Sequence, residues 1–267
     1  MTPNATAPTL NPLWHWPVDP GVQAGIGATG SALACILFLS PIPTFRQILS
    51  GRSTEGFSCD PYISSLCNCG FWVLYAIPTV TPDRTNPLIC NTFGLLCNLS
   101  YVGIFWTFVT PDNLRRTRIL ALFTALVLAT TCIVVFAIIP EPSEASDAVG
   151  YIAMAFNILM YGSPLTIIRK VIETKSVEFM PFYMTLCICL CSCSWVVYGV
   201  YVGDTHIMPP NACGVVFGVL QLALYAKYYD PKAKAKAAKD EIPSEVSPLM
   251  PSQVHAHEQL ATGPRIA

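Results

Sequence analysis

Residues 40–46 have the sequence SPIPTFR and residues 163–169 have the sequence SPLTIIR, so a serine-proline pair followed by an arginine occurs twice. An offset of about 123 residues relates the two stretches. The same offset, with small slips, aligns further residues along the chain: Ser53 with Ser176, Glu55 with Glu178, Pro61 with Pro181, Tyr62 with Phe182, Trp72 with Trp195, Tyr75 with Tyr198, Asn91 with Asn211 and Gly94 with Gly214. The chain therefore contains an internal repeat.

The composition predicts that lipid surrounds most of the chain. Hydrophobic residues make up 53% of the sequence and charged residues 12%, whereas a soluble domain carries about 25% charged residues. The net charge of -1 indicates no nucleic-acid partner. Seven apolar segments are long enough to cross roughly 30 Å of hydrocarbon as helices, namely residues 24–46, 60–80, 88–109, 118–139, 148–168, 182–203 and 207–228.

The number of spans in each copy determines how the copies are oriented. Three is odd, so directly joined copies would be inverted, but an extra fourth helix returns the chain and lets both insert the same way up. We therefore predict an all-α membrane protein with seven transmembrane helices, in which two parallel three-helix bundles are joined by an inversion helix. The expected parts are an extracellular tail at 1–22, the first repeat at 23–110, the linker helix at 111–142, the second repeat at 143–229 and a disordered cytosolic tail at 230–267.

Basic residues predict the orientation in the membrane. Of the fifteen lysines and arginines, only Arg84 falls on the side that also carries the N-terminus. The positive-inside rule then places the N-terminus outside and the C-terminus in the cytosol. The sequon at Asn4 would lie where glycosylation is possible, whereas the second sequon, at Asn98, lies inside a span and should stay unmodified.

The cysteines and histidines favour no metal site or other cofactor. Eleven of the twelve cysteines lie in apolar segments, where cysteine packs as a small hydrophobe; disulfides or a metal site are the less favoured alternative. The series Cys187, Cys189, Cys191 and Cys193 cannot converge on one metal ion, because alternate residues on a helix point about 200° apart. His255 and His257, in the tail, are expected to be solvated.

Four stretches resemble the signature motifs of the SWEET family of sugar uniporters. They are residues 40–45 (SPIPTF), 53–58 (STEGFS), 174–182 (TKSVEFMPF) and Pro210-Asn211 followed by Gly214. The resemblance implies facilitated, bidirectional diffusion of a mono- or disaccharide, expected to be a hexose such as glucose, by alternating access. SWEET proteins are a known example of parallel repeats about an axis along the membrane normal, with the substrate site near the midplane.

Repeat-related pairs supply the chemistry that a sugar site needs. Asn91 and Asn211 are amides within apolar helices, and Trp72 and Trp195 offer flat faces for the C–H surfaces of a sugar ring. Each asparagine could instead bond a neighbouring helix, and each tryptophan could belong to an interfacial belt. The resemblance assigns all four to the sugar pocket, and it adds Asn68, Cys191 and Met160 at its border. A bulky Met160 would favour a monosaccharide over sucrose.

Prolines and two outer residues carry the predicted conformational change. Pro41, Pro61, Pro164 and Pro181 recur by repeat, and each is expected to remove a helical hydrogen bond and so form a hinge. Helix-end punctuation is the alternative for Pro61 and Pro181. The resemblance implies that Tyr75 and Asp204 form an extracellular gate, although Tyr75 could be a belt residue and Asp204 a helix cap.

The composition of the spans argues against other mechanisms. Their cores contain no Asp, Glu, Lys, Arg or His, which proton relays and voltage sensors need, so coupled pumping is disfavoured, as is an enzyme. A seven-helix receptor and a proton-coupled carrier of another small polar solute are the alternatives. We expect a multi-pass protein of the plasma membrane that forms homo-oligomers.

Overall fold

The protein is described here by a computed structural model, which covers residues 10–54, 56–178 and 180–231. Asn4, His255 and His257, and most of the predicted cytosolic tail, lie outside these described residues. The described elements are α1 (Pro20–Leu39), α2 (Ile42–Gly51), α3 (Asp60–Ala76), α4 (Thr85–Phe108), α5 (Pro111–Ile133), the π-helical turn η1 (Val134–Ile138), α6 (Pro142–Leu159), α7 (Gly162–Thr174), α8 (Phe182–Val202) and α9 (Met208–Tyr228). Residues up to Tyr228 form one compact unit, and a second unit begins at Tyr229.

Six segments of the described chain are long and apolar enough to cross a membrane. Two of them are broken helices, since α1 runs on into α2 and α6 runs on into α7, so each of these pairs forms one span. The remaining predicted span, residues 60–80, corresponds to α3, which has 17 residues and is slightly shorter than the ~20 residues of a typical span. Together these segments give the seven predicted spans.

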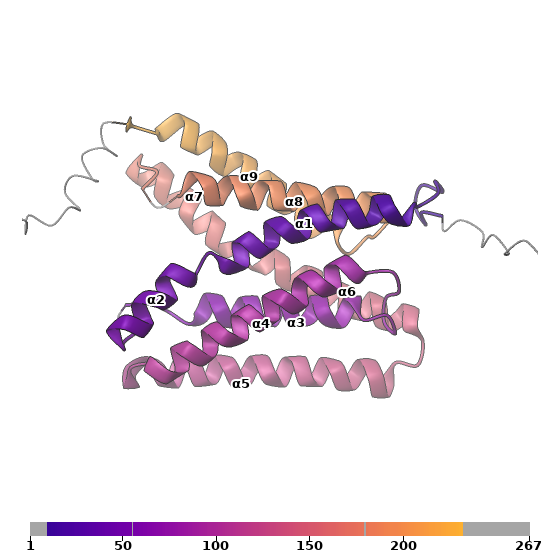
Figure 1. The fold of residues 1–267 in the computed structure, drawn as a ribbon, viewed down its shortest axis with the longest axis horizontal. Helices are drawn as coiled ribbons and strands as arrows, with labels where there is room; N and C mark the ends of the chain where they lie inside the picture. The colour runs from indigo at the N-terminus through magenta and orange to yellow at the C-terminus, as the bar shows by residue number, and fades with distance from the viewer. Residues whose placement is uncertain (1–9, 55, 179, 232–267) are drawn as a thin grey trace, which may run out of the picture. The chain divides into compact units, whose positions relative to one another are not determined.

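The two repeats use the same internal packing (Figure 1). The third span of each, α4 in the first and α9 in the second, contacts both the first and the second span of its own repeat. Between the repeats, α1 contacts α8 and α3 contacts α6. The linker helix α5 packs along α3. Figure 1 shows α2 and α7 at the same end of this unit, which is what two repeats inserted the same way up require.

The first span of each repeat breaks near its proline. Pro41 has no N–H to donate to the carbonyl of Leu37, and that oxygen accepts instead from the backbone N–H of Ser40 at 3.2 Å and from its hydroxyl at 2.7 Å. In the second repeat the break falls at Met160 and Tyr161, and Pro164, in the first turn of α7, has no N–H to donate to the carbonyl of Met160. These two breaks divide the spans that are expected to bend.

Pro61 and Pro181 lie at the N-terminal ends of helices rather than at a break within a span. Pro61 lies in the first turn of α3, and Pro181 is the residue that precedes α8. Neither removes a hydrogen bond within a helix, because the first N–H groups of a helix have no partner inside it. The expectation that each of the four prolines removes a helical hydrogen bond is therefore wrong for Pro61 and Pro181, which fit the alternative of helix-end punctuation.

The repeat symmetry extends to the backbone where the broken spans end. Arg52 closes α2 with φ of 49°, and Lys175 closes α7 with φ of 51°. Both residues adopt the left-handed conformation that commonly ends helices and that glycine usually occupies. Their shared conformation indicates that the two loops that follow leave their helices in the same direction.

Candidate functional site

A cavity of about 110 Å³ lies between the two repeats. Both repeats contribute to its lining, which mixes amide, aromatic and small apolar side chains and contains no charged residue: Ala34, Phe38, Asn68, Trp72, Pro87, Cys90, Asn91, Asn157, Trp195, Ile207 and Asn211. Five residues that the sequence predicts for the sugar pocket thus meet at one place: Asn68, Trp72, Asn91, Trp195 and Asn211.

The paired asparagines have the same geometry. The side-chain amide of Asn91 donates to the carbonyl of Pro87 at 2.9 Å, and that of Asn211 donates to the carbonyl of Ile207 at 2.8 Å. Both acceptors lie four residues earlier on the same stretch of chain, so neither asparagine bonds a neighbouring helix. The two side-chain carbonyl oxygens make no hydrogen bond within the described residues, and they are free to accept one from a solute.

The paired tryptophans are also related by the repeat. Trp72 is 5% exposed and Trp195 is 9% exposed, so neither side chain lies in an exposed interfacial belt. Trp72 meets Tyr75 edge to face at 5.6 Å between ring centroids, and Trp195 meets Tyr198 in the same way at 5.4 Å. Such contacts fix the orientation of a ring, and the two indoles are held alike on either side of the cavity.

The side-chain carbonyl oxygen of Asn68 lacks a hydrogen-bond donor. This oxygen is buried and has no hydrogen-bond partner, which costs roughly 1 to 3 kcal/mol in a folded protein. Because this residue lines the cavity, a hydroxyl group of a bound solute could supply the missing donor. An unpaired acceptor in this position is typical of a binding site.

Two predicted border residues do not line the cavity. The thiol of Cys191 is buried and lies 3.7 Å from the carbonyl of Gly30, where it helps to join α8 to α1. Met160 lies at the break between α6 and α7 and is half-buried. Asn157, three residues before it, lines the cavity instead. The sequence signal for Asn157 is an amide within an apolar helix, and the repeat does not reveal it because its counterpart is Ala34.

A hydrogen-bonded cluster joins the two repeats near the end of the unit that the sequence predicts to lie outside. The hydroxyl of Tyr75 donates to Asp204 at 2.9 Å, and Arg84 donates to the same carboxylate oxygen at 2.7 Å. The second oxygen of Asp204 accepts the backbone N–H groups of His206 and Ile207, each at 3.0 Å. Asp204 thus makes both the predicted bond to Tyr75 and the alternative helix-cap contacts.

Arg84 is a member of this cluster that the sequence did not predict for the gate. Burial opposes its charged form, but the carboxylate of Asp204 outweighs burial and raises the pKa of the Arg84 guanidinium above its usual value. The arginine therefore stays protonated across the physiological range, and it forms a 2.7 Å ion pair with Asp204, which is 3% exposed. Its position within the sequence, between two spans and beside an acidic residue, gave no sign of this partner.

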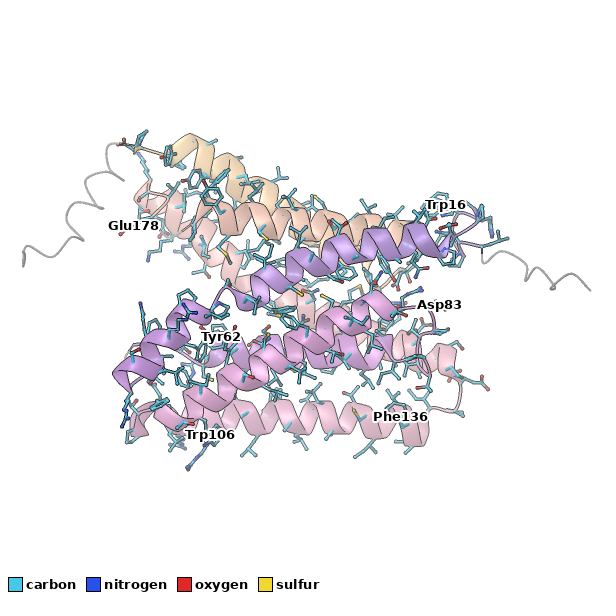
Figure 2. All side chains as sticks on the ribbon, viewed as in Figure 1. Trp16, Tyr62, Asp83, Trp106, Phe136 and Glu178 are labelled. Carbon is cyan, nitrogen blue, oxygen red and sulfur yellow. The ribbon has the colours of Figure 1, made fainter. Side chains whose placement is uncertain are left out.

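The segment before α1 fastens the first repeat to the second at the same end. The amide of Asn11 donates to the carbonyls of Val200 and Tyr201 at 3.0 and 2.8 Å, and Asn11 is fully buried. The indole N–H of Trp16 donates to Tyr201 at 3.1 Å. Figure 2 shows Trp16 and Asp83 at one end of the helices and Glu178 at the other. We call residues 10–19 the N-terminal clasp.

Comparison with known proteins identifies the family. One family model, described as a sugar efflux transporter for intercellular exchange, matches residues 24–113 and again residues 147–233. The chain is 35% identical over 223 residues to the bidirectional sugar transporter SWEET7 of Arabidopsis thaliana, covering 83% of this chain and 86% of that protein. It is 40% identical over 217 residues to SWEET2a of Sorghum bicolor, covering 80% and 87%.

A solved structure agrees with these relatives. The chain matches the structure of a eukaryotic SWEET transporter with a TM-score of 0.75 and 34% identity, covering 78% of this chain and 97% of that one. The protein therefore belongs to the SWEET family of transporters. Membership confirms the predicted resemblance, the arrangement of three, one and three membrane helices, and the prediction that the chain is not an enzyme.

Proposed function

We propose that this protein carries a sugar across a lipid bilayer by facilitated, bidirectional diffusion. The observation that supports this most directly is the cavity between the repeats, where the matched asparagines and tryptophans offer hydrogen bonding and flat apolar faces to one uncharged solute. A sugar needs both kinds of contact, because hydroxyl groups cover its rim and C–H groups its faces. Transport of sugars by its relatives adds support.

Alternating access is the mechanism that we propose for this chain. Among the described residues, Tyr75 and Arg84 bond Asp204 and Thr81 bonds Ser146, so these side-chain hydrogen bonds join the two repeats at the end opposite α2 and α7. Thiol contacts of Cys187 and Cys191 with α1 join the repeats further along. Within the described residues, α2 and α7 pack mainly against α4 and α9 of their own repeats. The breaks before Pro41 and Pro164 would let α2 and α7 move while α1 and α6 stay in contact with the other repeat.

The cavity favours a small solute, and we propose a hexose such as glucose over sucrose. Its volume of about 110 Å³ is below the ~300 to 1,000 Å³ of pockets that hold drug-sized ligands. A disaccharide would need the cavity to widen by more than one ring, whereas a monosaccharide needs less rearrangement.

The chemistry of the lining supports uncoupled transport. None of the eleven residues that line the cavity is charged, and proton-coupled carriers rely on ionisable groups near their substrate. We propose residence in the plasma membrane, with the N-terminus and the Asp204 cluster outside, and assembly into homo-oligomers. In that orientation the bonds of Tyr75 and Arg84 to Asp204 would hold the two repeats together at the outer end.

Uptake into vesicles tests the proposal. Purified protein in liposomes should equilibrate labelled glucose, with little uptake of sucrose, and should show no accumulation above the external concentration when a proton gradient is imposed. Vesicles without protein give the background. Uphill accumulation driven by protons would show a coupled carrier and contradict the proposed uniport. The absence of sugar uptake would contradict the proposed sugar transport altogether.

A further inference from the structure

A second cavity, of about 390 Å³, lies between the linker and the second repeat. Its volume falls within the ~300 to 1,000 Å³ of ligand pockets. Residues of α5, η1 and α6 line it: Leu126, Val127, Thr130, Thr131, Val134, Val135, Ala148, Val149 and Ile152. It shares no lining residue with the cavity between the repeats, so it is a separate site, which we call the α5–α6 groove.

The groove has a closed inner wall and an exposed outer edge. Val135 and Val149 are 4% and 0% exposed and belong to the main hydrophobic core, whereas Leu126 is 65% exposed and Ile152 is 40% exposed. The two helices that flank the groove, α5 and α6, both pack against α3. Because large exposed apolar surfaces of a membrane-spanning chain face lipid, the groove opens toward the acyl chains of the bilayer.

The lining suits a hydrocarbon chain better than a polar solute. Seven of its nine residues are aliphatic, and none is charged or an amide. The hydroxyl of Thr131 already donates to the carbonyl of Val127 at 2.9 Å. Apolar cavities of this kind stay dry and take up apolar molecules. The stretch of lining from Leu126 to Val134 extends over about 12 Å along the helix, which is long enough to hold part of one acyl chain.

Acidic residues lie at the end of the groove nearest the membrane surface. Glu144 precedes Ala148 by four residues in α6 and therefore lies on the same face, one turn further out. Glu144 has no ion-pair partner among the described residues. Residues 134–152 contain Glu141, Glu144 and Asp147 but no lysine or arginine. Figure 1 shows this connection from α5 to α6 at the end of the unit opposite α2 and α7.

We propose that the α5–α6 groove binds an acyl chain of a phospholipid whose headgroup carries a positively charged amine, such as phosphatidylethanolamine. The aliphatic lining holds the chain, and the carboxylate of Glu144 pairs with the ammonium group at the membrane surface. An anionic phospholipid offers the same chain, but three carboxylates repel its headgroup. The bound lipid bridges the linker helix and the first span of the second repeat, which both pack against α3.

Competition between two lipids tests the headgroup preference. The full chain, stripped of lipid in detergent, would be mixed with equimolar phosphatidylethanolamine and phosphatidylglycerol that carry the same acyl chains, and the bound lipid would be counted by native mass spectrometry. We expect the wild type to favour phosphatidylethanolamine by about 3- to 10-fold, as a single charge near the membrane surface would give. Glu144→Gln should lower this preference by at least about 2-fold.

Two neighbouring positions of α5 offer a matched pair of variants that test the groove itself. Thr130 and Ala129 are both exposed, but only Thr130 lines the groove. Thr130→Phe places a ring in the groove and should reduce bound phosphatidylethanolamine by at least about 5-fold, whereas Ala129→Phe should bind as the wild type does. Glu144→Gln leaves the lining unchanged, so it still tests the proposal if Thr130→Phe does not fold.

Three results would contradict the proposal. Equal lipid binding by Thr130→Phe and Ala129→Phe would place the lipid elsewhere on the chain. Equal retention of the two lipids by the wild type would show that the carboxylates do not select the headgroup. If Thr130→Phe abolished oligomers in the same spectra but kept its lipid, the groove would be a contact with a second copy of the chain.

Discussion

The first and third spans of each repeat meet at the same glycine positions. A Cβ atom added at Gly27 would overlap the side chain of Asn86 in α4, and one added at its counterpart Gly150 would lie 2.5 Å from the ring of His206, two residues before α9. Deeper in each repeat, a Cβ at Gly94 would overlap the ring of Phe38. Its counterpart at Gly214 would lie 2.5 Å from the hydroxyl of Tyr161. Both repeats thus have close contacts at equivalent glycines, although different side chains pack against these glycines in each repeat.

The repeats differ at the positions that line the cavity. Phe38 corresponds to Tyr161, whose hydroxyl donates to the carbonyl of Pro210 at 2.6 Å, and only Phe38 of these two lines the cavity. Asn68 and Asn157 have no amide counterpart. The comparison teaches that glycine contacts, which set the distance between helices, keep the two repeats alike, whereas the cavity side chains are free to diverge and give the site two unequal sides.

The largest expected effect concerns the pair that the repeats share. Asn91→Ala and Asn211→Ala should each reduce glucose uptake by roughly 5- to 100-fold, since each removes an amide that a desolvated hydroxyl would otherwise meet, a loss of about 1–3 kcal/mol. The two losses should be similar because the two geometries match. Uptake into liposomes measures this, with folding checked by gel filtration. Near-normal uptake in either variant would show that the cavity amides are not used symmetrically.

Substitution of a glycine tests the duplicated packing. Gly94→Ala forces the ring of Phe38 to move, and overpacking of this kind destabilises by about 1–3 kcal/mol. Gly103→Ala in the same helix is the control, because nothing lies within 4 Å of a Cβ there, and alanine favours the helix. The unfolding temperature in detergent should therefore fall for Gly94→Ala and stay unchanged or rise for Gly103→Ala. Equal unfolding temperatures of the two variants would mean that Gly94 is not in close contact with Phe38.

Much of this organisation follows from the sequence, and the exceptions have a physical cause. Hydropathy predicts the spans because lipid selects for apolar runs, and recurrence in both halves marks Trp72 and Asn91. The same search cannot find Asn157, because the residue opposite it is alanine. It cannot find the clasp either, since Asn11 bonds carbonyls 189 and 190 residues away, and no local pattern encodes such a contact.

The position of Met160 could not be predicted on the assumption that its helix is continuous. A continuous helix would turn this residue toward the cavity one turn before Pro164, but α6 ends at Leu159 and the chain changes direction at Met160 and Tyr161. Proline perturbs the preceding turn as well as its own position. The sequence shows that a break exists, and only the structure shows on which side of Met160 the helix ends.

The outer tyrosines offer a smaller test of the difference between repeats. The hydroxyl of Tyr75 donates to the buried carboxylate of Asp204, whereas that of Tyr198 accepts from Gln23 at 3.2 Å. Hydrogen bonds to charged groups contribute about 1.5–3 kcal/mol and neutral ones about 0.5–1.5 kcal/mol. Hydrogen exchange of residues 203–207 should therefore accelerate more in Tyr75→Phe than in Tyr198→Phe. An equal acceleration would argue that Asp204 is held by Arg84 and its cap contacts alone.

The smallest effect is expected where the repeats differ on the surface. Arg169 in α7 forms an ion pair with Glu173 at 2.7 Å, and both side chains are largely exposed. The corresponding positions of the first repeat are Arg46 and Ser50. Exposed pairs one turn apart on a helix stabilise by only ~0.3–0.5 kcal/mol, so Glu173→Ser, which makes the second repeat like the first, should leave the unfolding temperature and glucose uptake nearly unchanged. If Glu173→Ser lowered the free energy of unfolding by more than about 1 kcal/mol, the ion pair in α7 would be needed for stability. Because α2 has no such pair, the segments α2 and α7 would then not be equivalent.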